Sequence, residues 1–145
     1  MSEHNNINGR DSCFNLRKAS RAVTQYFDHA LEPAGIRATQ FTLLVTLASV
    51  SAKTLTEMAD HLVMDRTTLT RNLKPLEKLN LIQIVTAKDK RSKAYALSDH
   101  GRSVLEKGVP MWESAQCRVE EQLGNERYQK LLVELSAVTK LFEHM

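Results

Sequence analysis

Hydroxyl-bearing and cationic side chains follow Asp65 on one side of a predicted helix. At about 100 degrees per residue, the leucines of this segment form one stripe and the polar residues face the opposite side. The stripe comprises Leu69, Leu73, Leu76 and Leu79, and the polar side comprises Thr67, Thr70, Arg71 and Lys74. The polar side carries donors and positive charge, and its first acid is Glu77. Such a surface suits a partner rich in acceptors and negative charge, as DNA is.

A second cationic group lies between two predicted strands, at 81–86 and 93–97. The intervening segment, 87–92, is then the loop of a hairpin. The loop and the residue after it contain the cations Lys88, Lys90, Arg91 and Lys93, with Asp89 among them. The sequence therefore predicts a hairpin with a cationic tip.

Two short helices position the first cationic group. Thr54 and Glu57 have the spacing of a capping box, which predicts a helix that ends near Leu62. The residues Val63 and Met64 form a tight link to Asp65, whose carboxylate suits the N-cap of the next helix. This order predicts a helix-turn-helix whose second helix begins at Asp65.

The second helix has two notable positions near its end. Asn80 is expected to terminate it, because asparagine tolerates the left-handed conformation. Pro75 removes a helical hydrogen bond, and a bend is expected there. Either this bend has no contact with DNA, or it sets the angle of the first turns in the groove.

Longer helices flank this module. Apolar spacing predicts a helix over 11–32, a central helix from Gln40, and a long helix opened by Ser98 and bent near Gly108 and Pro110. A final apolar stripe either caps the core or joins a bundle between subunits, and the second interpretation is favoured. Its residues are Tyr128, Leu131, Leu132, Leu135, Val138, Leu141 and Phe142. We predict a mainly α fold with a small β-hairpin: a polar tail (1–10), a dimerisation helix (11–32), a winged helix-turn-helix lobe (33–98) and C-terminal dimerisation helices (99–145).

Bulk properties favour one compact cytoplasmic domain without a membrane partner. The 145 residues are 42% hydrophobic and 26% charged, and neither a spanning run nor a secretion signal is evident. A net charge of +3 decides little by itself, but the cations crowd the segment 66–93. The five histidines form no metal-spaced pair, and no nucleophile elbow or phosphate loop is present, so neither an enzyme nor a cofactor or metal is expected. A zinc-responsive regulator and an architectural winged helix remain alternatives.

Four motifs in order resemble the multiple antibiotic resistance regulator (MarR) family over nearly the whole chain. They are Leu55-Thr-Glu-Met-Ala-Asp-His-Leu62, Met64-Asp-Arg-Thr-Thr-Leu-Thr-Arg-Asn-Leu73, Asp89-Lys-Arg91 and Leu97-Ser-Asp-His-Gly101. The resemblance implies a regulator that binds double-stranded DNA as a homodimer with interleaved terminal helices. It also implies that Arg91 is the wing-tip arginine and that Asp89 orients it. Asn80 and Ser98 stand where the family usually has glycine and threonine, which are mild departures.

The DNA-binding roles divide by groove. We assign Thr67 and Arg71 to base edges, and Thr68, Thr70 and Lys74 mainly to phosphates. Arg91 is expected in the minor groove, with Lys88, Lys90 and Lys93 nearby or simply solvated. For Arg66, a structural ion pair and a DNA contact stay open. A dimer should prefer an inverted repeat.

Two modes of release are considered. Cys13 and the residues after it resemble the first helix of organic hydroperoxide regulators of the same family, with Arg17 and Phe27 at the places of two tyrosines and Tyr26 one position away. Arg17 could favour the Cys13 thiolate, or the thiol is buried, reduced and inert, as we expect of Cys117. The alternative is a small aromatic effector. Its candidate pocket residues are Tyr26, Phe41, Tyr95 and Trp112, which could equally be core.

Overall fold

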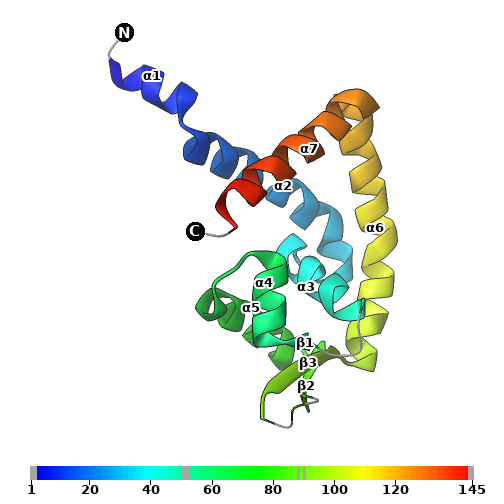
Figure 1. The fold of residues 1–145 in the computed structure, drawn as a ribbon. Helices are drawn as coiled ribbons and strands as arrows, with labels where there is room; N and C mark the ends of the chain where they lie inside the picture. Colours follow the sequence, from blue (N-terminus) through cyan, green and yellow to red (C-terminus); the bar gives the residue numbers. More distant parts are fainter. Residues whose placement is uncertain (1–2, 50–52, 88, 90, 144–145) are drawn as a thin grey trace.

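The protein consists of helices and one small antiparallel sheet, which lies at one end of the molecule (Figure 1). The computed structural model describes residues 3–49, 53–87, 89 and 91–143. A lobe containing the sheet lies at one end, and the helices of both termini lie at the other. The long helix α6 (Asp99–Leu123) runs between the two ends.

The lobe is a winged helix-turn-helix, as the sequence predicts. It contains α3 (Ala38–Ala48), α4 (Leu55–Leu62) and α5 (Arg66–Lys78), followed by the strands β2 (Ile82–Thr86) and β3 (Lys93–Leu97). The two strands pair in the register Ile82 to Leu97 and Thr86 to Lys93. A mainly α fold with a β-hairpin is thus confirmed.

A third strand, β1 (Lys53–Thr54), was not predicted. It pairs with β3 and gives the sheet the order β1-β3-β2. Thr54 is also the N-cap of α4: its hydroxyl accepts a hydrogen bond from the Glu57 amide at 3.2 Å. One residue therefore joins the wing sheet to the first helix of the helix-turn-helix.

The core of the lobe is aliphatic and continuous. Leu44, Met58, Leu69 and Leu76 have no exposed surface, and the leucine stripe of α5 faces this core. Leu79 is the exception on that stripe: it is 50% exposed, and it stands at the C-cap of α5, where the helix ends. The flanking helices also contribute, since Leu31 and Leu105 belong to the same cluster.

The terminal helices form the other end of the molecule. They are α2 (Ser12–Leu31), which a short 3-10 turn η1 (Glu32–Ala34) follows, and α7 (Asn125–Phe142). The polar tail before Asp11 differs from expectation because its residues form a helix, α1 (Glu3–Arg10). Pro110 lies inside α6, which nevertheless remains one helix through the predicted bend region.

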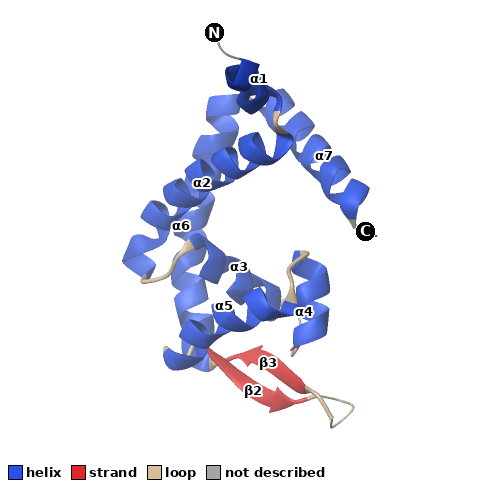
Figure 2. Cartoon of the chain, turned by 90° about the vertical axis from the view of Figure 1, so that its left-hand side faces the viewer, coloured by secondary structure: helices blue, strands red, loops and turns tan. Residues whose placement is uncertain are grey.

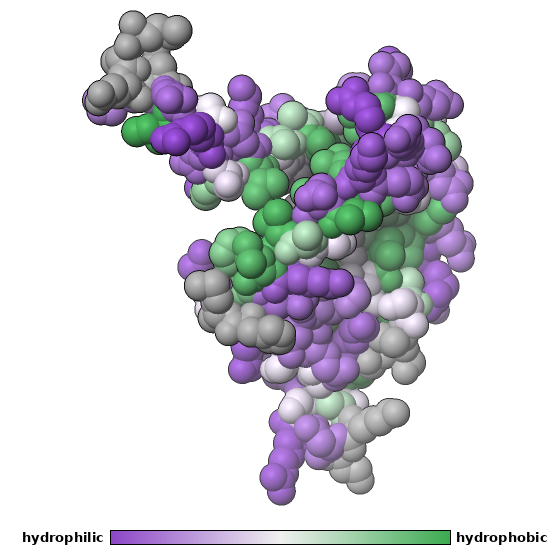
Figure 3. Space-filling model, turned by 45° about the horizontal axis from the view of Figure 1, so that its top comes forward, coloured by the Kyte–Doolittle hydropathy of each residue, from purple (hydrophilic) through white to green (hydrophobic). Residues whose placement is uncertain are grey.

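Helix α7 carries the apolar stripe predicted for it but buries none of its residues within the chain. Leu131, Leu132, Leu135 and Val138 are each about 40% exposed, and Leu141 and Phe142 more so. Figure 3 shows hydrophobic patches across this upper face of the molecule. None of the helices described is long and apolar enough to cross a membrane.

A tight joint connects the end of α5 to the start of α6. Asn80 has a left-handed backbone (φ 58°), as predicted, and its carbonyl accepts a hydrogen bond from the Ser98 hydroxyl. The Ser98 amide donates to the Leu81 carbonyl at 3.1 Å. Gly101 packs so closely on this backbone that a Cβ there would lie 1.9 Å from the Leu81 oxygen. Only glycine fits at this contact.

Candidate nucleic-acid interface

The N-terminus of α5 is capped as predicted by Asp65. One carboxylate oxygen accepts from the Thr68 amide at 2.9 Å, and the other accepts from the Thr68 hydroxyl at 2.7 Å. These two hydrogen bonds, the hydroxyl's first, hold the pKa of the Asp65 carboxyl below its usual value. The carboxylate therefore stays charged and fixes the first turn of α5.

The polar side of α5 faces solvent. The side chains of Thr67, Arg71 and Lys74 are exposed, opposite the buried leucines, as the helical projection requires. Among described residues, the charged groups of Arg71 and Lys74 lie in no ion pair. This leaves their donors available for a partner.

The hydroxyls of two predicted phosphate ligands, Thr68 and Thr70, already donate hydrogen bonds within the protein. The Thr68 hydroxyl donates to Asp65, and the partly buried Thr70 hydroxyl donates to the Arg66 carbonyl at 2.8 Å. A hydroxyl has one proton, and a phosphate offers only acceptors. Both threonines would have to rotate before donating to DNA, so their expected role does not follow from this arrangement.

The wing tip is organised by Asp89. Its carboxylate accepts hydrogen bonds from the Arg91 amide at 3.0 Å, from the Ser92 amide at 3.1 Å and from the Ser92 hydroxyl at 3.2 Å. The Arg91 amide is the main reason why the pKa of this carboxyl lies below its usual value. Asp89 therefore orients the backbone beneath Arg91, where the resemblance had suggested only that it orients the arginine. Lys88 and Lys90, also predicted here, lie outside the described residues.

Arg66 lies across a cleft from the wing. The cleft has a volume of about 600 Å³ and lies between the first turns of α4 and α5 and five residues of the wing, Asp89, Arg91, Ser92, Lys93 and Tyr95. Arg66, Arg91 and Lys93 all line it. The ion pair considered for Arg66 is not formed with any described residue.

Pro75 is exposed inside α5, and the helix continues past it to Lys78. The Pro75 carbonyl accepts a hydrogen bond from the Leu79 amide at 3.1 Å. Both interpretations of this proline, a neutral kink and an angle-setting bend, stay predictions.

The four aromatic candidates for an effector pocket do not form one group. Phe41 and Trp112 stack with ring centroids 6.0 Å apart, whereas Tyr26 meets Phe27 edge-on. Tyr95 lies on β3 and lines the cleft beside the wing, where burial, and secondarily the charge of Glu77, raise the pKa of its phenol. Phe41 and Tyr95 belong to the buried core, as the alternative interpretation expects, and an effector site beside the stacked Phe41 and Trp112 stays a prediction.

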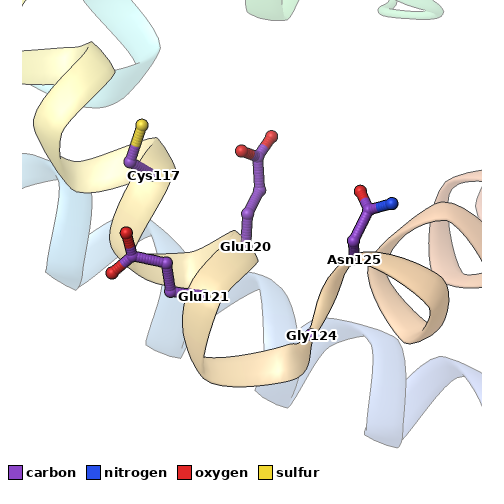
Figure 4. Close-up of a pocket in the computed structure, with 5 residues that line it drawn as sticks. All are labelled: Cys117, Glu120, Glu121, Gly124 and Asn125. Atoms are coloured by element: carbon purple, nitrogen blue, oxygen red, sulfur yellow. The ribbon is translucent and has the colours of Figure 1, made fainter.

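Both cysteines are exposed, so the expectation of buried thiols is wrong, and they form no disulfide with each other. Cys13 lies in the first turn of α2, on a part of the helix that has no buried residue. Cys117 lies on α6 beside Glu120 and Glu121, near the turn at Gly124 and Asn125 (Figure 4). Within the described residues, no three histidine, cysteine or acidic side chains come together as metal ligands.

Residues at the joints were missed by sequence reasoning. Ser92 holds Asp89, and Gly101 allows α6 to contact Leu81. Ser92 stands directly before a predicted strand and three residues after Asp89, a residue type that commonly bonds nearby backbone amides in turns, so its role had a signal. The contact of Gly101 had none, because it depends on two segments 20 positions apart in the chain.

Comparisons with known proteins agree with this geometry. The model of the MarR family matches residues 36–93, which cover the lobe from α3 to the start of β3. The structure of the Mycobacterium tuberculosis transcriptional regulator MosR in complex with DNA is 32% identical, with a TM-score of 0.79 over 90% of this chain and 96% of that one. The repressor CouR bound to p-coumaroyl-CoA is 26% identical, with a TM-score of 0.82 over 94% and 96%.

One curated relative bears on regulation. The organic hydroperoxide resistance transcriptional regulator of Bacillus subtilis is 32% identical over 98 residues, which are 67% of each chain. The chain spans about two thirds of the curated B. subtilis relatives that it matches. The chain has a winged helix-turn-helix with an exposed cationic helix, and it matches these relatives. It therefore belongs to the MarR family of DNA-binding transcriptional regulators, which are not enzymes.

Proposed function

We propose that the protein is a repressor that binds an inverted-repeat operator as a homodimer. The observation that carries the proposal is the exposed donor surface of α5, with Thr67, Arg71 and Lys74, next to a wing whose tip Asp89 holds in place. A helix of this kind reads base edges in the major groove, and a wing arginine is suited to the negative potential of a narrow minor groove. CouR, a structural relative, is named a repressor.

The exposed stripe of α7 supports the homodimer. A helix with this many apolar side chains and no buried residue needs a further surface, and a second copy supplies one by symmetry. The first half of α2 has the same character, since Phe14, Leu16 and Val23 are exposed. These helices of two copies together would form the bundle, with the two lobes at its ends.

Selection of bound duplexes from a random pool tests sequence reading. Enrichment of a palindrome with half-sites about 10 base pairs apart is expected. Binding without enrichment would instead favour the architectural alternative. Repression is tested with a reporter gene behind the enriched duplex, where higher expression with the protein than without it would contradict the proposal.

Arg91→Ala tests the wing. Loss of the minor-groove contact should weaken binding by about 1–3 kcal/mol and reduce its salt dependence. Unchanged affinity and salt slope in titrations with the enriched duplex would remove Arg91 from the interface.

Release by oxidation at Cys13 is the second part of the proposal. The exposed thiol near the start of α2 and the relation to an organic hydroperoxide resistance regulator favour it. Cys13→Ser should make DNA binding indifferent to organic hydroperoxide, with Cys117→Ser as the matched control. A Cys13→Ser variant that dissociates like the parent would leave a small effector near Phe41 and Trp112 as the mode of release, as CouR with its p-coumaroyl-CoA suggests.

A further inference from the structure

The cleft between the helix-turn-helix and the wing has an unusual charge distribution. Its walls carry the cations Arg66, Arg91 and Lys93 and the acids Glu57 and Asp89. Opposite charges this close commonly pair, yet within the described residues none of these side chains forms an ion pair. Each acid instead caps the backbone of its own segment.

Both acids are engaged by other donors. The Asp89 carboxylate accepts three hydrogen bonds, from the backbone amides of Arg91 and Ser92 and from the Ser92 hydroxyl. One oxygen of Glu57 accepts from the amide and the hydroxyl of Thr54 at 3.3 and 2.9 Å. These carboxylates cap a turn and α4, and among the described residues no acid pairs with Arg66, Arg91 or Lys93.

The position of the cleft indicates what fills it. If α5 lies in the major groove and the wing in the adjacent minor groove, the sugar-phosphate backbone that separates the grooves must pass between them. The cleft opens between those two elements. A phosphodiester group carries one negative charge and only acceptors, which matches the free donors of Arg66 and Lys93.

We propose that this cleft binds one phosphodiester group of the DNA strand between the two grooves, with Arg66 as its main ligand and Lys93 as the second. The bound phosphate bridges α5 and the wing and fixes the angle between them. This inference rests on the proposed mode of DNA binding. It assigns Arg66 to backbone positioning, leaving sequence reading to Arg71.

Arg66→Ala is tested by fluorescence anisotropy with the duplex enriched from the random pool and with a shuffled duplex of equal composition. The variant should bind both duplexes about tenfold more weakly, and the slope of log affinity against log salt should fall in magnitude by about one. Arg71→Ala should instead weaken mainly the enriched duplex. Lys107→Ala, which removes an exposed cation of α6, serves as the control and should change neither.

Methylphosphonate substitution locates the phosphate. Each phosphate of the enriched duplex is neutralised in turn, and one position per half-site should weaken the parent protein but leave Arg66→Ala unaffected. If every position weakens both proteins equally, Arg66 binds no phosphate and the inference is wrong, although the proposed function stands. If the parent enriches no sequence, the proposed function fails. Separately, an unchanged salt slope of Arg66→Ala on the shuffled duplex would overturn the phosphate site.

Discussion

Helices α5 and α7 both carry a leucine-rich stripe, but only one of them finds its partner within the chain. Leu69, Leu73 and Leu76 of α5 are at most 1% exposed, whereas α7 has no buried residue. Both stripes consist mostly of leucine, and the stripe of α7 also contains tyrosine, valine and phenylalanine. What differs is the surface that each stripe meets: α5 packs against the core of the lobe, whereas α7 buries no residue and lies on the opposite side of the view from α6 (Figure 2).

This contrast separates two sources of stability. The lobe is complete in one copy of the chain, so its packing should not depend on protein concentration. In the proposed homodimer a second copy buries the stripe of α7, so the contribution of this stripe to stability should vanish on dilution. The following changes test this division, from the largest expected effect to the smallest.

Leu73→Ala should lower the free energy of unfolding by about 2–5 kcal/mol, because it opens a cavity in a core that cannot fully collapse. Urea unfolding at two protein concentrations should give the same decrement. Leu79→Ala, on the same stripe but 50% exposed, is the matched control and should cost far less. Equal losses for the two variants would contradict the observed burial.

Leu135→Glu should raise the dissociation constant of the dimer on the order of 100-fold, because a charge replaces an apolar contact in the bundle. Sedimentation velocity measures the dissociation. The lobe should remain folded in the monomer, with the amide protection of α5 retained. A variant that stays dimeric would place the interface elsewhere.

Val63→Gly should stabilise the lobe by about 0.5–1 kcal/mol. Val63 caps α4 with a left-handed backbone (φ 53°), which is costly for a branched side chain, and its side chain is 61% exposed. Asn80→Gly provides the comparison, since asparagine tolerates its φ of 58° and should gain less. Thermal unfolding measures both, and a loss of stability in Val63→Gly would refute strain at this turn.

Acidification should loosen the α5 cap and the wing tip before it affects the leucine core. Asp65 and Asp89 have folded-state pKa values below normal, so their stabilisation is present above the unfolded value of about 3.9 and is lost as the pH falls through the folded values. Carboxylate chemical shifts followed by NMR give both midpoints. Midpoints at or above 3.9 would show that the hydrogen bonds are absent in solution.

Local signals carried most of the prediction of the fold. The capping box at Thr54, the N-cap at Asp65 and the left-handed Asn80 each depend on neighbours within three or four residues, and each is confirmed. Strand β1 was missed because a pair of residues shows no periodicity, and its pairing with Tyr95 depends on a segment about 40 positions away. The helix of residues 3–10 was missed because its residues are almost all polar and show no apolar spacing that would predict a helix.

At the DNA-binding surface, the sequence predicted which side chains are exposed better than it predicted what each side chain contacts. Arg71 and Lys74 are free on the surface, as expected from the projection. The hydroxyls of Thr68 and Thr70 donate to Asp65 and to the Arg66 carbonyl. A helical projection gives only the directions of side chains, so it does not predict these hydrogen bonds. The four aromatic residues do not line one pocket: Phe41 and Tyr95 both belong to the buried core, and Tyr95 also lines the wing cleft, which neither Phe41 nor Trp112 lines.

The joint at Leu81 and Gly101 bears on how a minimal DNA-binding fragment should be cut. A fragment ending at residue 98 would retain the helix-turn-helix and both wing strands but would expose the Leu81 backbone that Gly101 covers. It would also lose Leu105 from the core. The shortest self-sufficient piece therefore extends from Leu31 through the first three turns of α6, past Gly108, which packs on Leu31, Ile36 and Phe41. In a hybrid regulator, the transplanted lobe should include those turns as well.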